Sequence, residues 1–217
     1  MDEAALTGLR ERKKQLTRQQ ISAVATDLFL ERGFDEVTVA EVARAANVST
    51  KTVFNYFPRK EDLFFDRGPE AAALVTRALR GRAEGEGPLR AFVRLIGRQV
   101  AAGHPLGRMV AADVPFWRTV AESPTLRARI RELVQEAEIG LAALIASEQD
   151  LAEDELWPRV QAAAAVNVFR AVYGHAVARM LAGADPDLVA ADYLRELNRA
   201  CYALELGFAG AAGSGAA

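Results

Sequence analysis

The stretch that decides the fold is TVAEVARAANVSTKTVFNYF, residues Thr38–Phe57. It contains two short helical patterns, and each is preceded by its own start signal. Thr38 and Glu41 have the spacing of a capping box, and Ser49 is an N-cap residue for the second pattern. Between the patterns, Asn47 tolerates the left-handed backbone conformation that ends a helix. The sequence therefore predicts two short helices separated by a tight turn.

Each of these helices has an apolar side that can be buried. The small Ala43 and Ala46 allow the first helix to pack closely against a neighbour, and Val53 and Phe57 lie on one side of the second. Pro58 prevents the second helix from continuing past Phe57. Two short helices joined in this way are typical of a helix-turn-helix.

An amphipathic helix is predicted before this pair. Thr17 and Gln20 form a possible capping box, and Gly33 follows the last turn. We therefore expect residues 1–16 to form a basic, flexible arm and residues 17–63 to form the helix-turn-helix domain. The apolar stripe of the helix consists of Ile21, Val24, Ala25, Leu28 and Phe29.

The rest of the chain also has helical periodicity, which predicts an all-α fold. We expect a further helix from Lys60 to near Arg82, and then a break in the glycine-rich residues 81–88. Residues 64–208 are predicted to form a larger helical domain for effector binding and dimerisation, and residues 209–217 a disordered tail. The last two helices are expected at Pro158–Ala182 and Pro186–Phe208.

Composition limits the cellular setting. The chain has 217 residues, and 51% of them are hydrophobic. Cys201 is the only cysteine, so no intrachain disulfide can form and a reducing cytoplasm is expected. The first residues, MDEAALTGLRERKKQL, lack the apolar centre of a signal peptide. Arginines, an asparagine and a histidine interrupt the most apolar stretch, Ala162–Gly183, so we expect no membrane span.

Positive charge is concentrated near the N-terminus. The net charge of −2 argues weakly against a nucleic-acid partner for the chain as a whole. Residues 44–60, however, contain four basic residues and no acid, and residues 10–18 contain five basic residues and one acid. On a helical wheel, Lys51 and Asn55 point away from Val53. This pattern is typical of a phosphate-binding surface, although a solvated helix face would look the same.

Residues Thr17–Leu63 resemble the N-terminal domain of tetracycline-repressor (TetR) family regulators. The family pattern is visible in ERGFDEVTVAEVARAANVSTKTVFNYFPRKEDLF, residues Glu31–Phe64. The resemblance implies a homodimeric transcription regulator that binds double-stranded DNA at a palindromic operator. It further implies a repressor that an unidentified small-molecule effector, bound by the helical domain, releases from the operator.

The resemblance also assigns roles to individual residues. Thr38 matches a position that contacts phosphate, and Lys60 matches a lysine that faces phosphate at the start of the next helix. Lys51 stands where many members have glycine, and its favoured base contact is guanine O6 and N7. Phe54 replaces a frequent tyrosine. The implied DNA-binding residues are Thr38, Ser49, Thr50, Lys51, Thr52, Phe54, Asn55, Tyr56 and Lys60.

Two further sets of residues are expected in the helical domain. The dimer interface is predicted from the spacing of apolar and small residues on the last two helices. It comprises Ala171, Gly174, Ala178, Leu194, Leu197, Cys201 and Leu204. The effector pocket is predicted from aromatic and polar groups in or near apolar segments. Its candidates are His104, Phe116, Trp117, Asn167, Arg170 and Tyr173.

No catalytic motif is found in the sequence. It has no glycine-rich phosphate loop, nucleophile elbow or spacing of metal ligands, so we expect no enzyme activity, no cofactor and no metal. Two alternatives remain open: an all-α enzyme, and a helical adaptor that uses its basic face for an acidic protein. These residues do not predict the effector, the operator sequence, or whether the regulator represses or activates its target genes.

Overall fold

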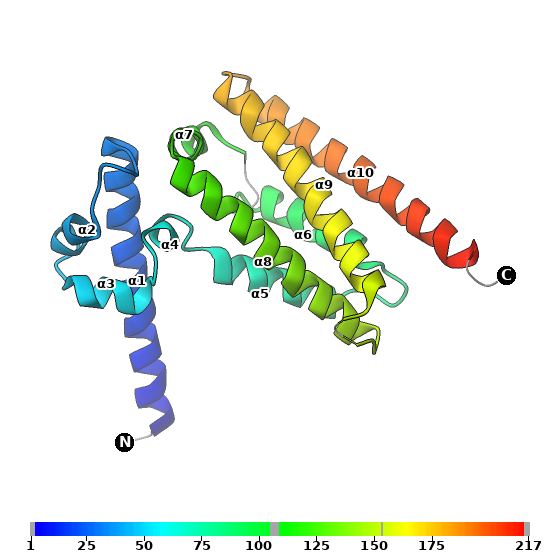
Figure 1. The fold of residues 1–217 in the computed structure, drawn as a ribbon, viewed down its shortest axis with the longest axis horizontal. Coiled ribbons are helices and arrows are strands. Elements are labelled where there is room, and N and C mark those ends of the chain that lie inside the picture. The colour runs from blue at the N-terminus through cyan, green and yellow to red at the C-terminus, as the bar shows by residue number, and fades with distance from the viewer. Residues whose placement is uncertain (1–2, 105–108, 153, 215–217) are drawn as a thin grey trace. The chain divides into compact units, whose positions relative to one another are not determined.

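In a computed structural model, residues 3–104, 109–152 and 154–214 are described, with side chains from residue 12 to residue 207 of these ranges. All regular elements in these ranges are helical (Figure 1), which confirms the predicted all-α class. The helices are α1 (Glu3–Arg32), α2 (Val39–Ala45), α3 (Thr50–Tyr56), α4 (Lys60–Phe64), α5 (Gly68–Arg80), α6 (Pro88–Ala101), the 3-10 turn η1 (Ala111–Asp113), α7 (Val114–Glu122), α8 (Pro124–Glu148), α9 (Leu156–Leu181) and α10 (Pro186–Ser214).

The chain divides into two compact units. Unit 1 comprises Met1–Asp66 and Arg118–Arg129, and unit 2 comprises Arg67–Trp117 and Ile130–Ala217. The second segment of unit 1 was not expected from a domain boundary at residue 63. Within unit 1, the buried Ser123 hydroxyl donates to Asp35 Oδ1 over 3.2 Å. This bond ties the later segment to the helix-turn-helix region.

The local signals around α2 and α3 act as predicted. Thr38 and Glu41 form the capping box of α2, and the Ser49 hydroxyl accepts from the Thr52 backbone N–H over 3.0 Å. Asn47 has a φ of 55° in the turn, and Gly33 has a φ of 89° after α1. These positive φ values are the left-handed conformations that asparagine and glycine tolerate best.

The predicted start of α1 was wrong. The helix begins at Glu3, so residues 3–16 of the expected flexible arm are helical, and residues 1–2 lie outside the described residues. The Thr17 hydroxyl donates to the Lys13 carbonyl over 3.0 Å, and Gln20 Nε2 donates to the Ala46 carbonyl over 3.3 Å. Residues 3–16 contain no proline and many good helix formers, so a capping pattern within them does not have to start a helix.

Two other predicted boundaries were also wrong. The helix expected from Lys60 to Arg82 is broken between α4 and α5, where Pro69 lies in the first turn of a new helix. Proline suits such a start because the first backbone N–H groups have no intrahelical partner. At the other end, α10 continues through Ser214, so most of the expected disordered tail is helical. Residues 215–217 lie outside the described residues.

Aromatic rings occupy the core of unit 1. The Phe29 ring centroid lies 4.9 Å from that of Phe34 and 5.8 Å from that of Phe64. Val53 and Phe57, at 0% and 1% exposure, anchor the second helix of the pair in this core. Their burial fixes which side of α3 faces outward.

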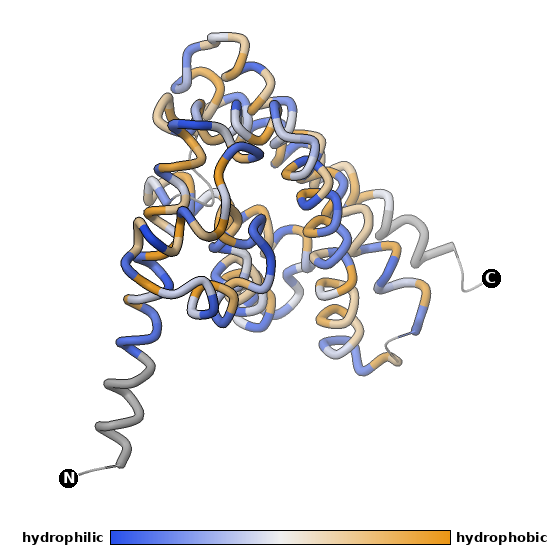
Figure 2. The backbone as a smooth tube through the Cα atoms, turned by 60° about the vertical axis from the view of Figure 1, so that its left-hand side comes forward, coloured by the Kyte–Doolittle hydropathy of each residue, from blue (hydrophilic) through white to orange (hydrophobic). Residues whose placement is uncertain are grey.

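Unit 2 is a helical bundle. In it, α9 and α10 pack along one another, and α6 contacts both α10 and α5 (Figure 1). Hydrophobic and hydrophilic residues alternate along the helices (Figure 2), as expected for helices with one face in a core. Among the described residues, no helix is both long enough and apolar enough to cross a membrane.

Candidate nucleic-acid interface and ligand cavity

Helix α3 is held in place at both ends. Ser49 caps its start, and Arg18 of α1 reaches its end, where Nη1 donates to the Tyr56 carbonyl over 2.9 Å. The same guanidinium lies 4.3 Å from the Phe57 ring centroid, and its Nη2 donates to the Asp66 carbonyl over 3.1 Å. Arg18 was predicted only as part of a basic cluster. The structure shows that it fastens α3 to α1.

The outward side of α3 has the composition that the helical wheel predicts. Lys51, Phe54 and Asn55 are exposed, and Thr52 and Tyr56 are partly buried. Phe54 has 47% of its surface exposed, so this side of α3 presents an aromatic ring beside its polar groups. The helix carries no acidic residue. This side can therefore approach a polyanion without a repelling carboxylate of its own.

Thr38 is exposed but its polar atoms already have partners. Its hydroxyl and its backbone N–H each donate to Glu41 Oε2 over 2.8 Å. The bond from the Thr38 N–H is the main reason that the pKa of Glu41 falls to about 2, with the Thr38 hydroxyl and Arg32 adding to it. The predicted phosphate contact of Thr38 would have to compete with these bonds.

Lys60 does not point outward as predicted. Its ammonium donates to the Phe34 carbonyl and lies 4.3 Å from the Phe34 ring centroid. Burial lowers the pKa of Lys60. The cation lies against the ring faces of the aromatic core, where the negative face of an aromatic ring attracts it. In this position the ammonium contacts the core of unit 1 and does not lie on the outward surface with Lys51.

The positive charge near α3 is also smaller than the sequence suggests. Lys60 points inward, and Arg59 Nε lies 3.6 Å from Glu61 Oε2, so the carboxylate offsets the charge of Arg59. Arg44 and Lys51 are exposed. On α1, a second exposed basic group consists of Arg12, Lys13 and Lys14. Ser49 and Thr50 are exposed beside Lys51.

In unit 2, the structure brings together the aromatic members of the predicted effector pocket. The Trp117 ring centroid lies 5.1 Å from that of Phe116 and 5.4 Å from that of Tyr173. Tyr173 also stacks on Phe169 at 5.3 Å, and burial raises the pKa of Tyr173. These rings form one cluster inside the bundle.

The polar members of that prediction lie elsewhere. Asn167 and Arg170 are exposed on α9, where Arg170 Nη2 donates to Asn167 Oδ1 over 3.2 Å. His104 Nε2 lies 3.0 Å from Glu70 Oε1. Asn167 and Arg170 have apolar neighbours in the sequence, but both side chains lie on the exposed side of α9.

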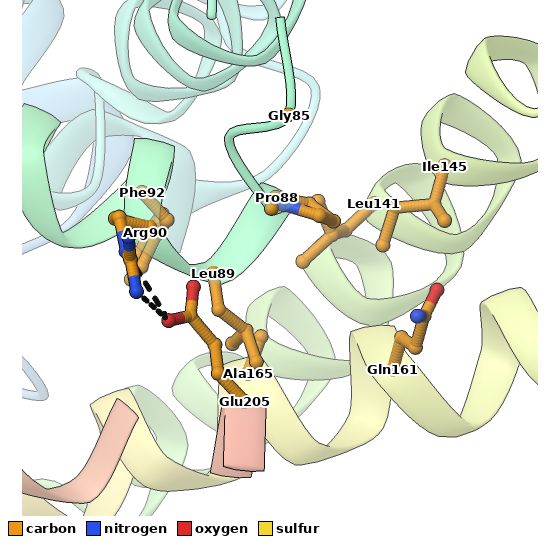
Figure 3. A pocket seen from close by; sticks show the side chains of 11 residues that line it. Gly85, Pro88, Leu89, Arg90, Phe92, Leu141, Ile145, Gln161, Ala165 and Glu205 are labelled. Atoms are coloured by element: carbon orange, nitrogen blue, oxygen red, sulfur yellow. Dashed lines mark hydrogen bonds and ion pairs between the residues drawn. The ribbon is translucent and has the colours of Figure 1, made fainter. Parts of the chain in front are cut away.

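A cavity of about 250 Å³ lies in unit 2, where α6, α8, α9 and α10 meet the glycine-rich turn before α6 (Figure 3). None of the six predicted pocket residues lines it. Sequence reasoning missed it because its walls come from segments far apart in the chain, and the turn was read only as a helix break. Residues on its wall include Leu89, Phe92, Leu141, Ile145, Gln161 and Glu205.

The cavity contains an unusual carboxylate. Glu205 Oε2 accepts from Arg90 Nε and Nη2 over 3.2 and 2.9 Å. Glu205 Oε1 is buried and has no hydrogen-bond partner among the described residues. A buried acceptor without a donor is costly, and such a group in a native structure calls for an explanation.

The predicted dimer residues divide into two groups. Leu197 and Cys201 are 0% and 3% exposed within the single chain, so they belong to the core of unit 2 and their prediction as interface residues was wrong. Leu194 and Leu204 pack against the same core. The heptad-like spacing of these residues predicts a buried helix contact. It does not distinguish a contact within one subunit from a contact between two subunits. The exposed members are Ala171, Gly174 and Ala178 on α9.

The sequence and the fold were compared with those of known proteins. Residues 21–66 match the family described as "Bacterial regulatory proteins, tetR family". TcmR of Streptomyces glaucescens, an HTH-type transcriptional regulator, is 34% identical over 189 residues, which cover 84% of this chain and 81% of TcmR. LuxR of Vibrio harveyi is 46% identical over 46 residues, covering 21% of this chain and 22% of LuxR.

A solved structure supports the fold over a greater length. NalD of Pseudomonas aeruginosa, described as the secondary repressor of the MexAB-OprM multidrug efflux pump, matches with a TM-score of 0.53. The match covers 86% of this chain and 97% of NalD, with 22% sequence identity. At this identity it shows a shared fold. Together with the similarity to TcmR over most of both chains, these matches show that the chain belongs to the tetR family of bacterial regulatory proteins.

Proposed function

We propose that this DNA-binding transcriptional regulator is a homodimeric repressor, which reads a palindromic operator and leaves it when a small molecule binds unit 2. Membership of the family decides against the alternative of an all-α enzyme. The observation that carries the proposal is the acid-free outward side of α3, where Lys51, Phe54 and Asn55 are exposed over a buried anchor. The protein would act where the bacterial chromosome lies, in the cytoplasm.

The chemistry of this surface suits the major groove. Lys51 has no ion pair among the described residues, so its ammonium is available for guanine O6 and N7 or for a phosphate. Phe54 offers an apolar surface to a thymine methyl group, and Asn55 offers an amide that can pair with adenine or bind phosphate. The hydroxyls of Ser49 and Thr50 at the start of α3 could contact the same groove or its edge.

Selection of bound DNA from random duplexes tests sequence-specific binding. We expect a palindromic motif, with half-site centres about one helical turn or a multiple of it apart. Lys51→Ala should lower affinity for that motif by roughly 5- to 150-fold if Lys51 reads a base. Arg80→Ala, which removes an exposed cation from α5 in unit 2, is the matched control. Failure to enrich any motif at moderate salt would rule out specific operator binding.

Dimerisation is proposed through the outer sides of α9 and α10. Gly174 lies exposed on α9, and a Cβ added there would meet no atom within 4 Å apart from the adjacent helix backbone. Leu188, Tyr202 and Leu206 are exposed on α10 at 63%, 59% and 58%. Exposed apolar side chains beside small residues favour close contact with a second copy.

Light scattering tests this interface. Gly174→Arg should convert a dimer to a monomer without unfolding the subunit. Gly140 of α8 is also exposed and without close neighbours, so Gly140→Arg is the matched control and should remain a dimer. A Gly174→Arg protein that stays dimeric would remove this face from the proposal.

A further inference from the structure

We infer that the effector binds in the cavity beside Glu205, and that it is a small apolar molecule that presents a hydrogen-bond donor, a hydroxyl or an amine, to Glu205 Oε1. The inference rests on the proposed function, in which unit 2 receives an effector. It adds a location and a chemical class. It also distinguishes this cavity from the aromatic cluster around Tyr173, which the sequence favoured.

The unpartnered oxygen defines the polar end of the ligand. Arg90 occupies Oε2 of Glu205 with two donors, and no described residue donates a hydrogen bond to Oε1, which lies close to Gly87 (Figure 3). A carboxylate oxygen only accepts hydrogen bonds, so its missing partner must be a donor. A bond to an ionised acceptor is roughly twice as strong as one between neutral groups. A ligand that supplies the donor therefore gains binding free energy, because the acceptor is already removed from water.

The remaining wall defines the body of the ligand. Leu89, Phe92, Leu141 and Ile145 present apolar side chains, and Gln161 is a second polar group (Figure 3). With a volume of about 250 Å³, the cavity has room for more than a few water molecules. That space suits a single aromatic ring with a short side chain. The side of such a ligand that packs against this wall would leave water, which favours binding in proportion to the apolar area buried.

The charges on the wall disfavour an acidic ligand. Arg90 and Glu205 are the charged residues among those that line the cavity. The Arg90 side chain is 63% exposed and already pairs with Glu205, so its field is largely screened by water. An anion inside the cavity would instead face the buried lone pairs of Oε1. A donor is attracted at this point and a carboxylate is repelled.

Three probes of equal shape test the chemical class on the full-length protein. 2-Phenylethylamine, 2-phenylethanol and phenylacetate differ at one end only, as an amine, an alcohol and an acid. Titration calorimetry or ligand-detected NMR measures their Kd values without DNA. We expect the amine and the alcohol to bind at least about tenfold more tightly than the acid. Equal or tighter binding of phenylacetate, or no binding of the amine and alcohol, would overturn the inference.

Two substitutions test the location. Gly87 has a φ of −66°, which alanine adopts freely, and a Cβ there would lie 3.3 Å from Glu205 Oε1. Gly87→Ala should therefore press a methyl group against the oxygen, hinder the approach of a donor, and weaken the amine and alcohol by about tenfold without changing any charge. Gly97→Ala is the control, because a Cβ at Gly97 in the same helix meets no atom within 4 Å.

Glu205→Gln removes the charge and keeps the shape. It should weaken the amine by about tenfold and the alcohol by less, because the amine loses a charge-assisted bond. Glu196→Gln is the control, since Glu196 lies on the same helix with its carboxylate 47% exposed and outside the cavity. Binding that persists unchanged in both Gly87→Ala and Glu205→Gln would place the ligand elsewhere and overturn the inference.

A separate measurement distinguishes this inference from the proposed function. DNA release is measured on the selected duplex, with the best-binding probe added. If Gly87→Ala weakens both probe binding and probe-induced DNA release by about tenfold, the result supports both. Cavity binding without DNA release would refute the effector role of the site while leaving DNA binding by α3 untouched. A protein that binds probes but selects no DNA would refute the proposed function instead.

Discussion

The cap of α3 gives a prediction whose size follows from the structure. Ser49→Ala removes the hydroxyl that accepts from the Thr52 backbone N–H over 3.0 Å. It also removes the 2.8 Å contact between the two side-chain hydroxyls. Helix α3 has only seven residues, Thr50–Tyr56, and a helix of this length is not stable without its cap and its core contacts.

The expected loss of unfolding free energy is about 1 kcal/mol, the typical cost of replacing a serine N-cap by alanine. The site is exposed, so water can partly replace the lost acceptor, and a loss well above about 2 kcal/mol is not expected. For a chain of this size, 1 kcal/mol corresponds to a decrease in Tm of roughly 2–4 °C. Calorimetry suits the measurement because it also detects whether the two units unfold separately.

Two controls make this prediction refutable. Ser49→Asn keeps a good capping acceptor and should retain nearly all of the stability. Ser147→Ala makes the same chemical change at an exposed position within α8, where alanine is the better helix former, and should not lower the Tm. If Ser49→Ala left the Tm unchanged, or if Ser49→Asn lowered it equally, the cap would not be what stabilises the start of α3.

Three further predictions follow from burial and charge. The pKa of Glu41 lies near 2, below its ordinary 4.5, so the stability that its carboxylate adds is present above pH 4.5 and lost as the pH falls towards 2. Glu41→Gln should remove that part of the acid dependence, measured by urea unfolding at several pH values. Burial raises the pKa of Cys201 to about 11, so a thiol reagent at pH 8 should label Cys201 in the unfolded chain and leave the native one unlabelled. Leu197→Ala should cost about 2–5 kcal/mol in urea unfolding, because Leu197 is fully buried. Leu188→Ala, at 63% exposure, should cost little stability, and a cost equal to that of Leu197→Ala would contradict the assigned burial.

Much of unit 1 could be predicted because its signals are local. Capping boxes, left-handed turn residues and the side of a helix that carries Val53 depend on residues within about one turn of each other. For that reason the positions of α2 and α3, and the exposure of Lys51 and Asn55, were correct. The start of α1 was wrong for a related reason. A capping pattern is also compatible with a helix interior, and the residues around Thr17 favour helix on both sides.

The residues that the sequence misplaced are those whose partners lie far away in the chain. The family resemblance assigned Lys60 to phosphate, but only the folded core shows the Phe34 ring and carbonyl that hold its ammonium. The seam of Leu197 and Cys201 has the periodicity of a helix interface. Whether that interface is intramolecular depends on the helices that fold back against it.

The sequence alone was sufficient for the helix-turn-helix, the all-α class and the family, because these rest on short-range patterns and on residues in a recognisable order. Only the tertiary structure placed Glu205 at a cavity with its Oε1 unpartnered, since Gly87 and Glu205 meet across more than a hundred residues of chain. It also showed that Arg18 donates a hydrogen bond to the end of α3. The aromatic rings around Trp117 and Tyr173 form a cluster that is separate from the cavity wall. Local signals placed α2, α3 and the turn between them, whereas cavities and unpartnered polar atoms arise from contacts between distant segments.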